Sequence, residues 1–251
     1  MKKLSIALLA LAMAVAITPT ALAGTIPNIV YDNTNSVGVQ AWTGNMAEIF
    51  TVNSPITIVE LGVFDNGSAT LSSDLQVGIA SISGGVSTPV GGASYTFLTT
   101  GTYASADNNV FEPIAPVTLS PGTYEVDVVG FGPLQLMGND DGCTPGGGYQ
   151  CVGTSTGPGA TLNNLNGAIT FNGVAFDNNT PSITPLNYPN FTTVTTSDAG
   201  PLSGSTNGPA NQFGAGTFAV SPEPDSLFLL GTGLLGLAFV AFRQVKASRL
   251  A

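Results

Sequence analysis

Carboxylates are the side chains best suited to chemistry in this sequence, because other common catalytic groups are missing. The chain contains no histidine, so the Ser-His-Asp and Cys-His arrangements of nucleophilic enzymes cannot form. Residues 24–226 contain no lysine or arginine, which excludes Schiff bases and cationic clamps for phosphates or oxyanions. The adjacent Asp140 and Asp141 could still act as a carboxylate pair, as in glycoside hydrolases. Adjacent acids in a Gly-rich loop are more typical of solvated turns, so we expect no enzymatic activity.

The same acids offer hard oxygen ligands for a cation. Asp65 stands beside Asn66, and Asp140 and Asp141 follow Asn139. Loops of this kind can hold Ca²⁺ through carboxylate and amide oxygens, although neither cluster has the EF-hand spacing. Turn-forming Asp and Asn explain both clusters equally well without a metal. Calcium is therefore the one cofactor that the sequence leaves open.

Cys143 and Cys151 are the only cysteines, and they enclose a turn-rich loop. An even number of cysteines in an exported chain favours a disulfide. A zinc site is disfavoured, since two sulfurs without histidine leave the usual ligand set incomplete. We therefore expect a Cys143–Cys151 bridge.

Trp42 is the single tryptophan and stands in a polar stretch. An exposed Trp ring there would suit contact with a polysaccharide, whereas a buried ring would be part of the core. The sequence leaves both interpretations open.

The elements that position these residues are predicted to be short strands. Apolar residues alternate with others in 75–80 and in 124–128, where Glu125 and Asp127 lie on the face opposite Tyr124. Ile56 and Ile58 are out of phase with Val59, Leu61 and Val63, which predicts a bulge or a strand covered on both faces. Gly, Pro and Asn separate these runs, and no helical period occurs between residues 24 and 220. The fold class is therefore predicted to be all-β, an antiparallel β-sandwich or jelly roll over residues 24–196.

Two turns and a linker complete the expected domain. Asp65-Asn66-Gly67 suits a turn with positive φ, and Pro121-Gly122 suits a type II turn. Residues 197–220 are rich in Gly, Ser, Pro and Asn, and are predicted to form a linker.

Charge is distributed unevenly along the chain, whose net charge is -10. All five basic residues lie at the two ends of the chain, whereas residues 24–220 contain acidic residues and no basic ones. A surface with acids and no cations repels phosphate backbones, so nucleic acid is excluded as a partner.

Residues 1–23 are predicted to be a signal peptide. Lys2 and Lys3 precede an apolar stretch, and Ala21 and Ala23 form the small-residue A-x-A cleavage site. We expect an exported chain that begins at Gly24.

Residues 221–251 combine three further features. Pro222-Glu223-Pro224 is an extended segment that can be neither helix interior nor central strand. Residues 227–242 carry no charge and are predicted to be a transmembrane helix of about 24 Å. Arg243, Lys246 and Arg249 follow as a basic stop, which places the C-terminus in the cytoplasm and the ectodomain outside.

The three features of this tail, in their order, resemble the PEP-CTERM sorting domain. The resemblance covers about the last 30 residues and implies a substrate of exosortase, a membrane enzyme that often accompanies exopolysaccharide production. The stretches 58–65, 75–79 and 119–124 also look like the jelly-roll ectodomains common in PEP-CTERM proteins. Ser221, where the family often has Val, and the spacing of the basic residues depart from the pattern.

These observations predict a non-enzymatic structural or interaction protein of the cell surface or exopolysaccharide matrix, membrane-anchored at least transiently. A carbohydrate-binding module is the main alternative, and a carboxylate-dependent glycoside hydrolase a weaker one.

Overall fold

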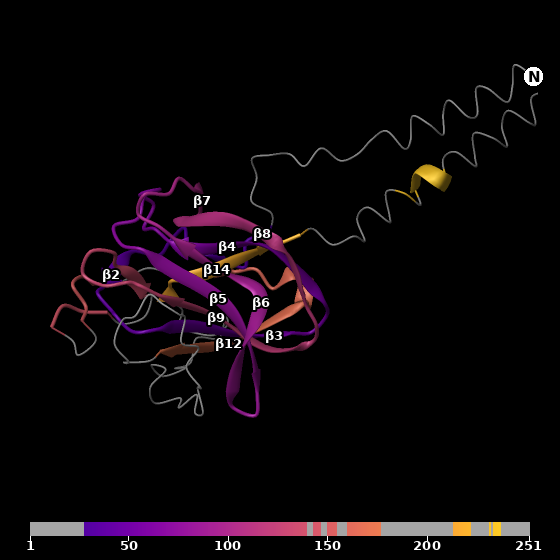
Figure 1. The fold of residues 1–251 in the computed structure, drawn as a ribbon, viewed down its shortest axis with the longest axis horizontal. Coiled ribbons are helices and arrows are strands. Elements are labelled where there is room, and N and C mark those ends of the chain that lie inside the picture. Colours follow the sequence, from indigo (N-terminus) through magenta and orange to yellow (C-terminus); the bar gives the residue numbers. More distant parts are fainter. Residues whose placement is uncertain are drawn as a thin grey trace, which may run out of the picture.

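The described chain folds into two antiparallel sheets with smaller sheets beside them (Figure 1). The computed structural model describes residues 28–139, 143–146, 150–154, 160–176, 213–221, 231 and 233–236. The five-stranded sheet has the order β12 (Ile169–Phe176), β3 (Met46–Val52), β9 (Gly122–Val129), β5 (Leu75–Ser83) and β6 (Val86–Phe97). The four-stranded sheet has the order β14 (Gly216–Val220), β4 (Ile56–Phe64), β8 (Asn109–Leu119) and β7 (Ala104–Ala106). The predicted all-β class is confirmed.

The smaller elements are short. A three-stranded sheet joins β13 (Phe213–Gly214), β10 (Met137–Asn139) and β2 (Gly38–Gln40). Two further strands, β1 (Tyr31–Asp32) and β11 (Thr161–Leu162), pair with each other, and a 3-10 turn, η1 (Leu165–Gly167), precedes β12. A jelly-roll ectodomain is compatible with this architecture.

The two larger sheets pack face to face around one core. The alternating residues Leu75, Val77 and Ile79 of β5 are fully buried, as their period predicts. Across the sandwich, a Cβ on Gly216 of β14 would lie within 3.5 Å of Val77 and 3.2 Å of Val126. A larger residue here would press against Val126, so the glycine allows the sheets to approach closely. The ring contact between Phe50 of β3 and Phe218 of β14 spans the same gap.

Strand β4 contains the irregularity that its sequence predicts. Ala219 and Val220 of β14 are consecutive but lie opposite Glu60 and Ile58, so β4 has one extra residue, Val59, at this point. Ile58 and Leu61 are both fully buried as a result, although three positions separate them. The bulge is confirmed.

The predicted turns have different outcomes. Asn66 and Gly67 both have positive φ, of 57° and 73°, as the Asp-Asn-Gly sequence predicts. At the connection between β8 and β9, however, Gly122 is already the first residue of β9 and lacks the positive φ of a type II turn. The type II prediction is wrong. The Tyr124 hydroxyl instead donates a hydrogen bond of 2.9 Å to the Ser120 carbonyl and closes this connection.

The predicted boundaries need a second correction near the C-terminus. Residues 213–214 and 216–220, expected within the 197–220 linker, are strands β13 and β14 of the ectodomain. All five residues of β14 are buried. The domain therefore extends past residue 196, because the four-stranded sheet takes its outermost strand from the end of the ectodomain.

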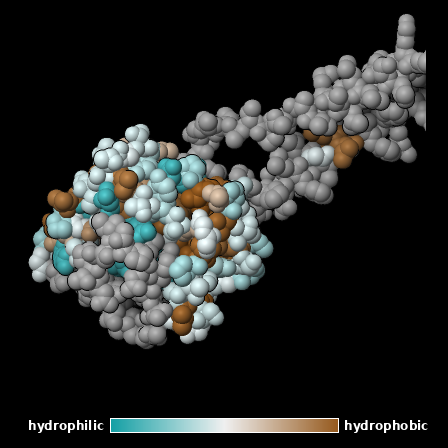
Figure 2. All heavy atoms as spheres, viewed as in Figure 1, coloured by the Kyte–Doolittle hydropathy of each residue, from teal (hydrophilic) through white to brown (hydrophobic). Residues whose placement is uncertain are grey.

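Proline residues lie along one edge of each larger sheet. Pro89 lies in edge strand β6, and Pro113 and Pro116 lie in β8, whose partner β7 covers only residues 109–111. Proline has no N–H to offer an incoming strand, so these edges resist pairing with other chains. Figure 2 shows a mainly weakly polar surface, with a hydrophobic area on the right of the body and smaller hydrophobic groups elsewhere.

Candidate sorting segment and the body that carries it

Strand β14 connects the ectodomain to the tail. It pairs with β4 from Gly216 opposite Val63 to Val220 opposite Ile58. The next residue, Ser221, donates its backbone N–H to the Thr57 carbonyl at 2.9 Å. Pro222 follows immediately in the sequence. Only Ser221 therefore separates the Pro222-Glu223-Pro224 motif from a buried strand.

The other edge of β14 holds the first described residues of the chain. Val30 donates its N–H to the Phe218 carbonyl at 3.0 Å, and Val220 donates to the Asn28 carbonyl at 3.3 Å. Ile29 forms a β-bridge with Ala219 between them. The residues just after the predicted signal peptide and those just before the tail thus hold each other in place.

The terminal predictions themselves lie outside the described residues. These are Ala21 and Ala23 of the cleavage site, the motif Pro222-Glu223-Pro224, and the basic residues Arg243, Lys246 and Arg249. Of the predicted membrane helix 227–242, only Gly231 and residues 233–236 are described, and their backbone is helical. Within the described segments, no helix is both long and apolar enough for a membrane span.

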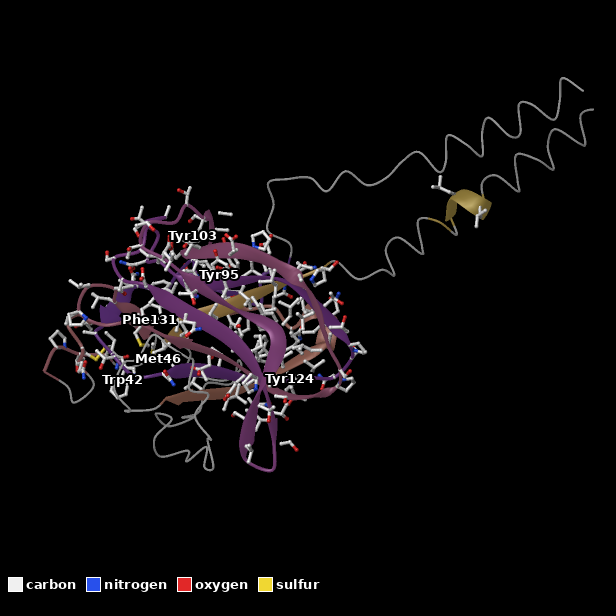
Figure 3. All side chains as sticks on the ribbon, viewed as in Figure 1. Trp42, Met46, Tyr95, Tyr103, Tyr124 and Phe131 are labelled. Atoms are coloured by element: carbon white, nitrogen blue, oxygen red, sulfur yellow. A yellow bond between two sulfur atoms is a disulfide. The ribbon has the colours of Figure 1, made fainter. Side chains whose placement is uncertain are left out.

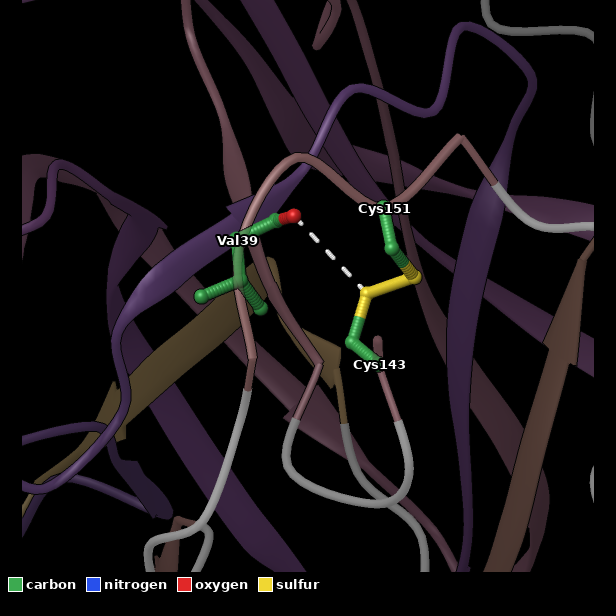
Figure 4. Close-up of a disulfide and its surroundings, with 3 residues drawn as sticks. All are labelled: Val39, Cys143 and Cys151. Atoms are coloured by element: carbon green, nitrogen blue, oxygen red, sulfur yellow. Dashed lines mark hydrogen bonds between the residues drawn. A yellow bond between two sulfur atoms is a disulfide. The ribbon is translucent and has the colours of Figure 1, made fainter. Parts of the chain in front are cut away.

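The predicted disulfide is confirmed. Cys143 and Cys151 are bonded, with their Cα atoms 5.5 Å apart, and both are buried (Figure 4). The Cys143 Sγ atom lies 3.7 Å from the Val39 carbonyl oxygen. Two backbone hydrogen bonds, from Val152 to Val39 and from Ala41 to Gln150, fasten the loop end to β2. The bridge therefore closes the loop between Cys143 and Cys151, and the hydrogen bonds hold the end of that loop against β2.

The Asp65 carboxylate is used by its own turn. One oxygen accepts the Gly67 N–H at 2.9 Å and the other accepts the Ala69 N–H at 2.6 Å. Asn66, its neighbour, accepts the Gly38 N–H at 2.8 Å. Asp65 is 1% exposed, and a buried carboxylate needs hydrogen-bond donors. The N–H groups of Gly67 and Ala69 are those donors. Asp140 and Asp141 lie outside the described residues. Among the described residues, no other acids gather with Asp65 into a group that could hold a metal ion.

Trp42 belongs to the core. Its side chain is 6% exposed and lies within the main hydrophobic cluster, and Figure 3 places it beside Met46 and Phe131, at the end of the body opposite Tyr124. Of the two interpretations left open by the sequence, the structure selects burial. The ring is not available as a surface platform for a sugar.

The structure also shows two buried acids on β9. The sequence predicted the face of the sheet on which they lie but not their burial. Glu125 and Asp127 lie opposite Tyr124 and Val126, as the alternation predicts, but both are fully buried. Burial raises the pKa of Glu125 to about 7, and the Ser87 hydroxyl opposes the rise. Within the described part of the chain, neither Glu125 oxygen makes a hydrogen bond of good geometry. A period-2 pattern gives the face of a residue but not what covers that face.

Another buried acid, Glu48, lies on the inner face of the sandwich. Glu48 of β3 is 2% exposed and shares the inner face with Phe50, two residues along the strand. Burial, and secondarily the charge of Glu48, raise the pKa of Tyr31 well above its ordinary value. The alternation of β3 did not predict the burial of Glu48. The period requires an apolar residue at position 48, and the sequence has an acid there.

The class of protein defined by these features is an all-β ectodomain whose last core strand leads directly into a C-terminal sorting segment. The chain carries a PEP-CTERM protein-sorting motif, matched over residues 222–244. Comparison with curated proteins and with solved structures gives no match. The motif implies processing by exosortase and an exported, membrane-associated surface protein.

Proposed function

We propose that this protein is a structural or interaction component of the cell surface or exopolysaccharide matrix, without enzymatic activity, delivered through its PEP-CTERM signal. The observation that carries the proposal is the position of the motif, which only Ser221 separates from buried strand β14. A cut within residues 221–225 would remove the tail and leave every core strand in place. The released ectodomain would therefore remain a folded passenger.

The chemistry of the ectodomain supports a passive role. Without histidine, lysine or arginine in residues 24–226, carboxylates are the main groups left to act as general acid or base. The Asp65 carboxylate is committed to its turn, and the two acids on the outer face of β9 are buried. A sandwich with proline-bearing edges and a disulfide suits durable exposure outside the cell.

The decisive experiment follows the C-terminus of the mature protein. The full chain should be produced in cells with and without an exosortase, and the exported form analysed by mass spectrometry. We expect a C-terminus within residues 221–225 only when exosortase is present. Glu223→Gln, which alters the motif, should reduce this processing, whereas the matched Glu112→Gln on β8 should not. Recovery of the full-length protein in the cytosol would refute the proposal.

The absence of activity and the identity of a ligand need their own assays. Purified ectodomain should show no turnover of polysaccharides, and turnover lost in Asp140→Asn or Asp141→Asn would instead support a hydrolase. Glycan binding would favour the carbohydrate-binding alternative. Because Trp42 is buried, Trp42→Ala would test the core rather than a binding site.

A further inference from the structure

The ectodomain has two ends of different charge, and their placement relative to the tail indicates how it stands on a membrane. Strand β14 runs from one end to the other and leaves the body beside Thr57. We call the connections at this exit the tail-side loops. They are Asn53–Pro55, Ser120–Pro121 and residues 163–167.

Contacts hold these loops together at the exit. Asn53 donates its backbone N–H to the Ala168 carbonyl at 2.8 Å and its side-chain amide to the Gly167 carbonyl at 2.9 Å. Ile56 pairs with Leu119, and Val52 pairs with Gly122, so the two connections that cross between the sheets, β3 to β4 and β8 to β9, lie side by side. In Figure 1 the ends of β3, β8 and β14 lie toward the same side of the body.

The tail-side loops contain no charged residue. Their sequences are Asn-Ser-Pro, Ser-Pro and Asn-Asn-Leu-Asn-Gly, and Ser54 and Ser120 are exposed. Such a surface can approach a bilayer without taking a carboxylate out of water, which would be costly. It also avoids repulsion from anionic lipid head groups.

The described loop acids gather at the opposite end. Asp65 follows the last residue of β4, Asp74 precedes β5, and Asp107 precedes β8. Hydrogen bonds join these connections, because Asp65 donates its N–H to the Asn108 carbonyl at 2.9 Å and Asp74 accepts the Thr99 N–H at 2.7 Å. Asp32, the last residue of β1, belongs to the same end, since Asn108 also binds the Asn33 carbonyl.

Two lengths decide between the orientations. From Thr57 to Asp65, strand β4 spans about 26 Å, which is several Debye lengths at physiological salt. The six residue steps from Ser221 to Leu227 reach at most about 20 Å. While the apolar segment 227–242 is in a bilayer, the tether is too short to let the acidic end turn onto the surface.

We infer that the tail-side loops form a membrane-facing surface, and that the uncleaved protein stands on the lipid bilayer with this uncharged end inward and its acidic end outward. This inference rests on the proposed function, because it needs the tail to insert. It adds that the motif meets the membrane enzyme below an ectodomain whose uncharged end faces the bilayer.

The test uses the full chain in vesicles of equal parts phosphatidylcholine and phosphatidylglycerol, with nitroxide-labelled head groups as quencher. A fluorescent label is attached through Ser54→Cys at the tail side or, as matched control, through Thr100→Cys at the acidic end, with the native disulfide left oxidised. Both positions are exposed. Near-ultraviolet circular dichroism identifies any variant that fails to fold, and Ser120→Cys and Thr102→Cys then replace the pair.

We expect quenching at position 54 to be at least threefold that at position 100. Equal quenching at both, or stronger quenching at position 100, in protein that floats with the vesicles would overturn the orientation and leave the sorting proposal intact. Protein that does not float with the vesicles would overturn both, because the tail would not have inserted.

Discussion

The rings of Phe50 and Phe218 lie with their centroids 5.1 Å apart, and this contact joins the first long strand of one sheet to the last strand of the other. Both side chains are fully buried. Phe218 stands only four residues before Pro222. The core of the ectodomain therefore depends on the segment that adjoins the sorting motif.

Replacing Phe218 by alanine should strongly destabilise the ectodomain. Phe→Ala in a packed core costs about 3–5 kcal/mol, because transfer free energy is lost and a cavity remains. Urea denaturation of the ectodomain, residues 24–221, measures the change in free energy of unfolding. Leu134→Ala is the control, since Leu134 is 77% exposed and should change stability by less than about 0.5 kcal/mol. Equal effects of the two substitutions would contradict the role of the contact.

The position at which the chain is cut should decide whether the product is folded. A chain ending at Ser221 keeps β14, whereas one ending at Ala215 leaves one edge of β4 unpaired and removes Phe218. We expect the first to give a cooperative thermal transition and the second to lose it or to resist expression in soluble form. Circular dichroism and size-exclusion chromatography measure this. Cooperative unfolding of both chains at the same temperature would show that β14 is dispensable.

Stability should fall as pH rises toward neutrality because of Glu125. Its pKa is raised from 4.5 to about 7 by burial, so the folded state binds a proton more tightly than the unfolded chain. The resulting stabilisation is complete below about pH 4.5 and is lost as pH rises through 7, by up to about 3 kcal/mol. Burial also raises the pKa of Glu60, which adds to the trend in the same direction.

Glu125→Gln isolates this contribution. The amide is always neutral, so the decrease in free energy of unfolding between pH 4.5 and 7.5 should be much smaller than in the wild type. Urea titrations across this range measure it, with Glu112→Gln as a control for loss of a half-buried carboxylate. An unchanged pH profile in Glu125→Gln would show that this carboxyl titrates normally.

The disulfide should contribute modestly and locally. For the small loop between Cys143 and Cys151, the chain-entropy relation gives about 2–3 kcal/mol. The double substitution Cys143→Ser with Cys151→Ser should lower the free energy of unfolding by no more than this. Hydrogen exchange should accelerate most at Ala41 and Val152, whose N–H groups bond across the loop. Uniform acceleration over β3 and β9 would instead indicate a global role.

Asp65 should stabilise its turn without calcium. Asp65→Ala leaves the N–H groups of Gly67 and Ala69 without their acceptors, which should cost about 1–3 kcal/mol. Asp65→Asn keeps one acceptor oxygen and should cost less. Thermal unfolding of the wild type in EDTA and in Ca²⁺ should give the same Tm. A calcium-dependent rise in Tm that Asp65→Asn abolishes would establish a metal site here.

The sequence by itself determined the local features of this protein. Alternation placed Leu75, Val77 and Ile79 on the core face, and the phase change after Ile58 located the bulge. The Asp-Asn-Gly turn was equally readable, because positive φ is a property of a few residues. The sorting motif could be predicted for the same reason. Its prolines, its apolar segment and its terminal basic residues are defined by their order along the chain.

The tertiary structure alone decided which segments meet. Thr217-Phe218-Ala219-Val220 has strand composition, yet the Gly- and Ser-rich residues before it favoured a linker, and only pairing with β4 about 160 positions earlier makes it a core strand. The burial of Trp42 and Glu125 was decided in the same way. The burial of a residue depends on which distant segments cover it. Strands that pair across such long separations carry no periodic pattern that identifies their partners.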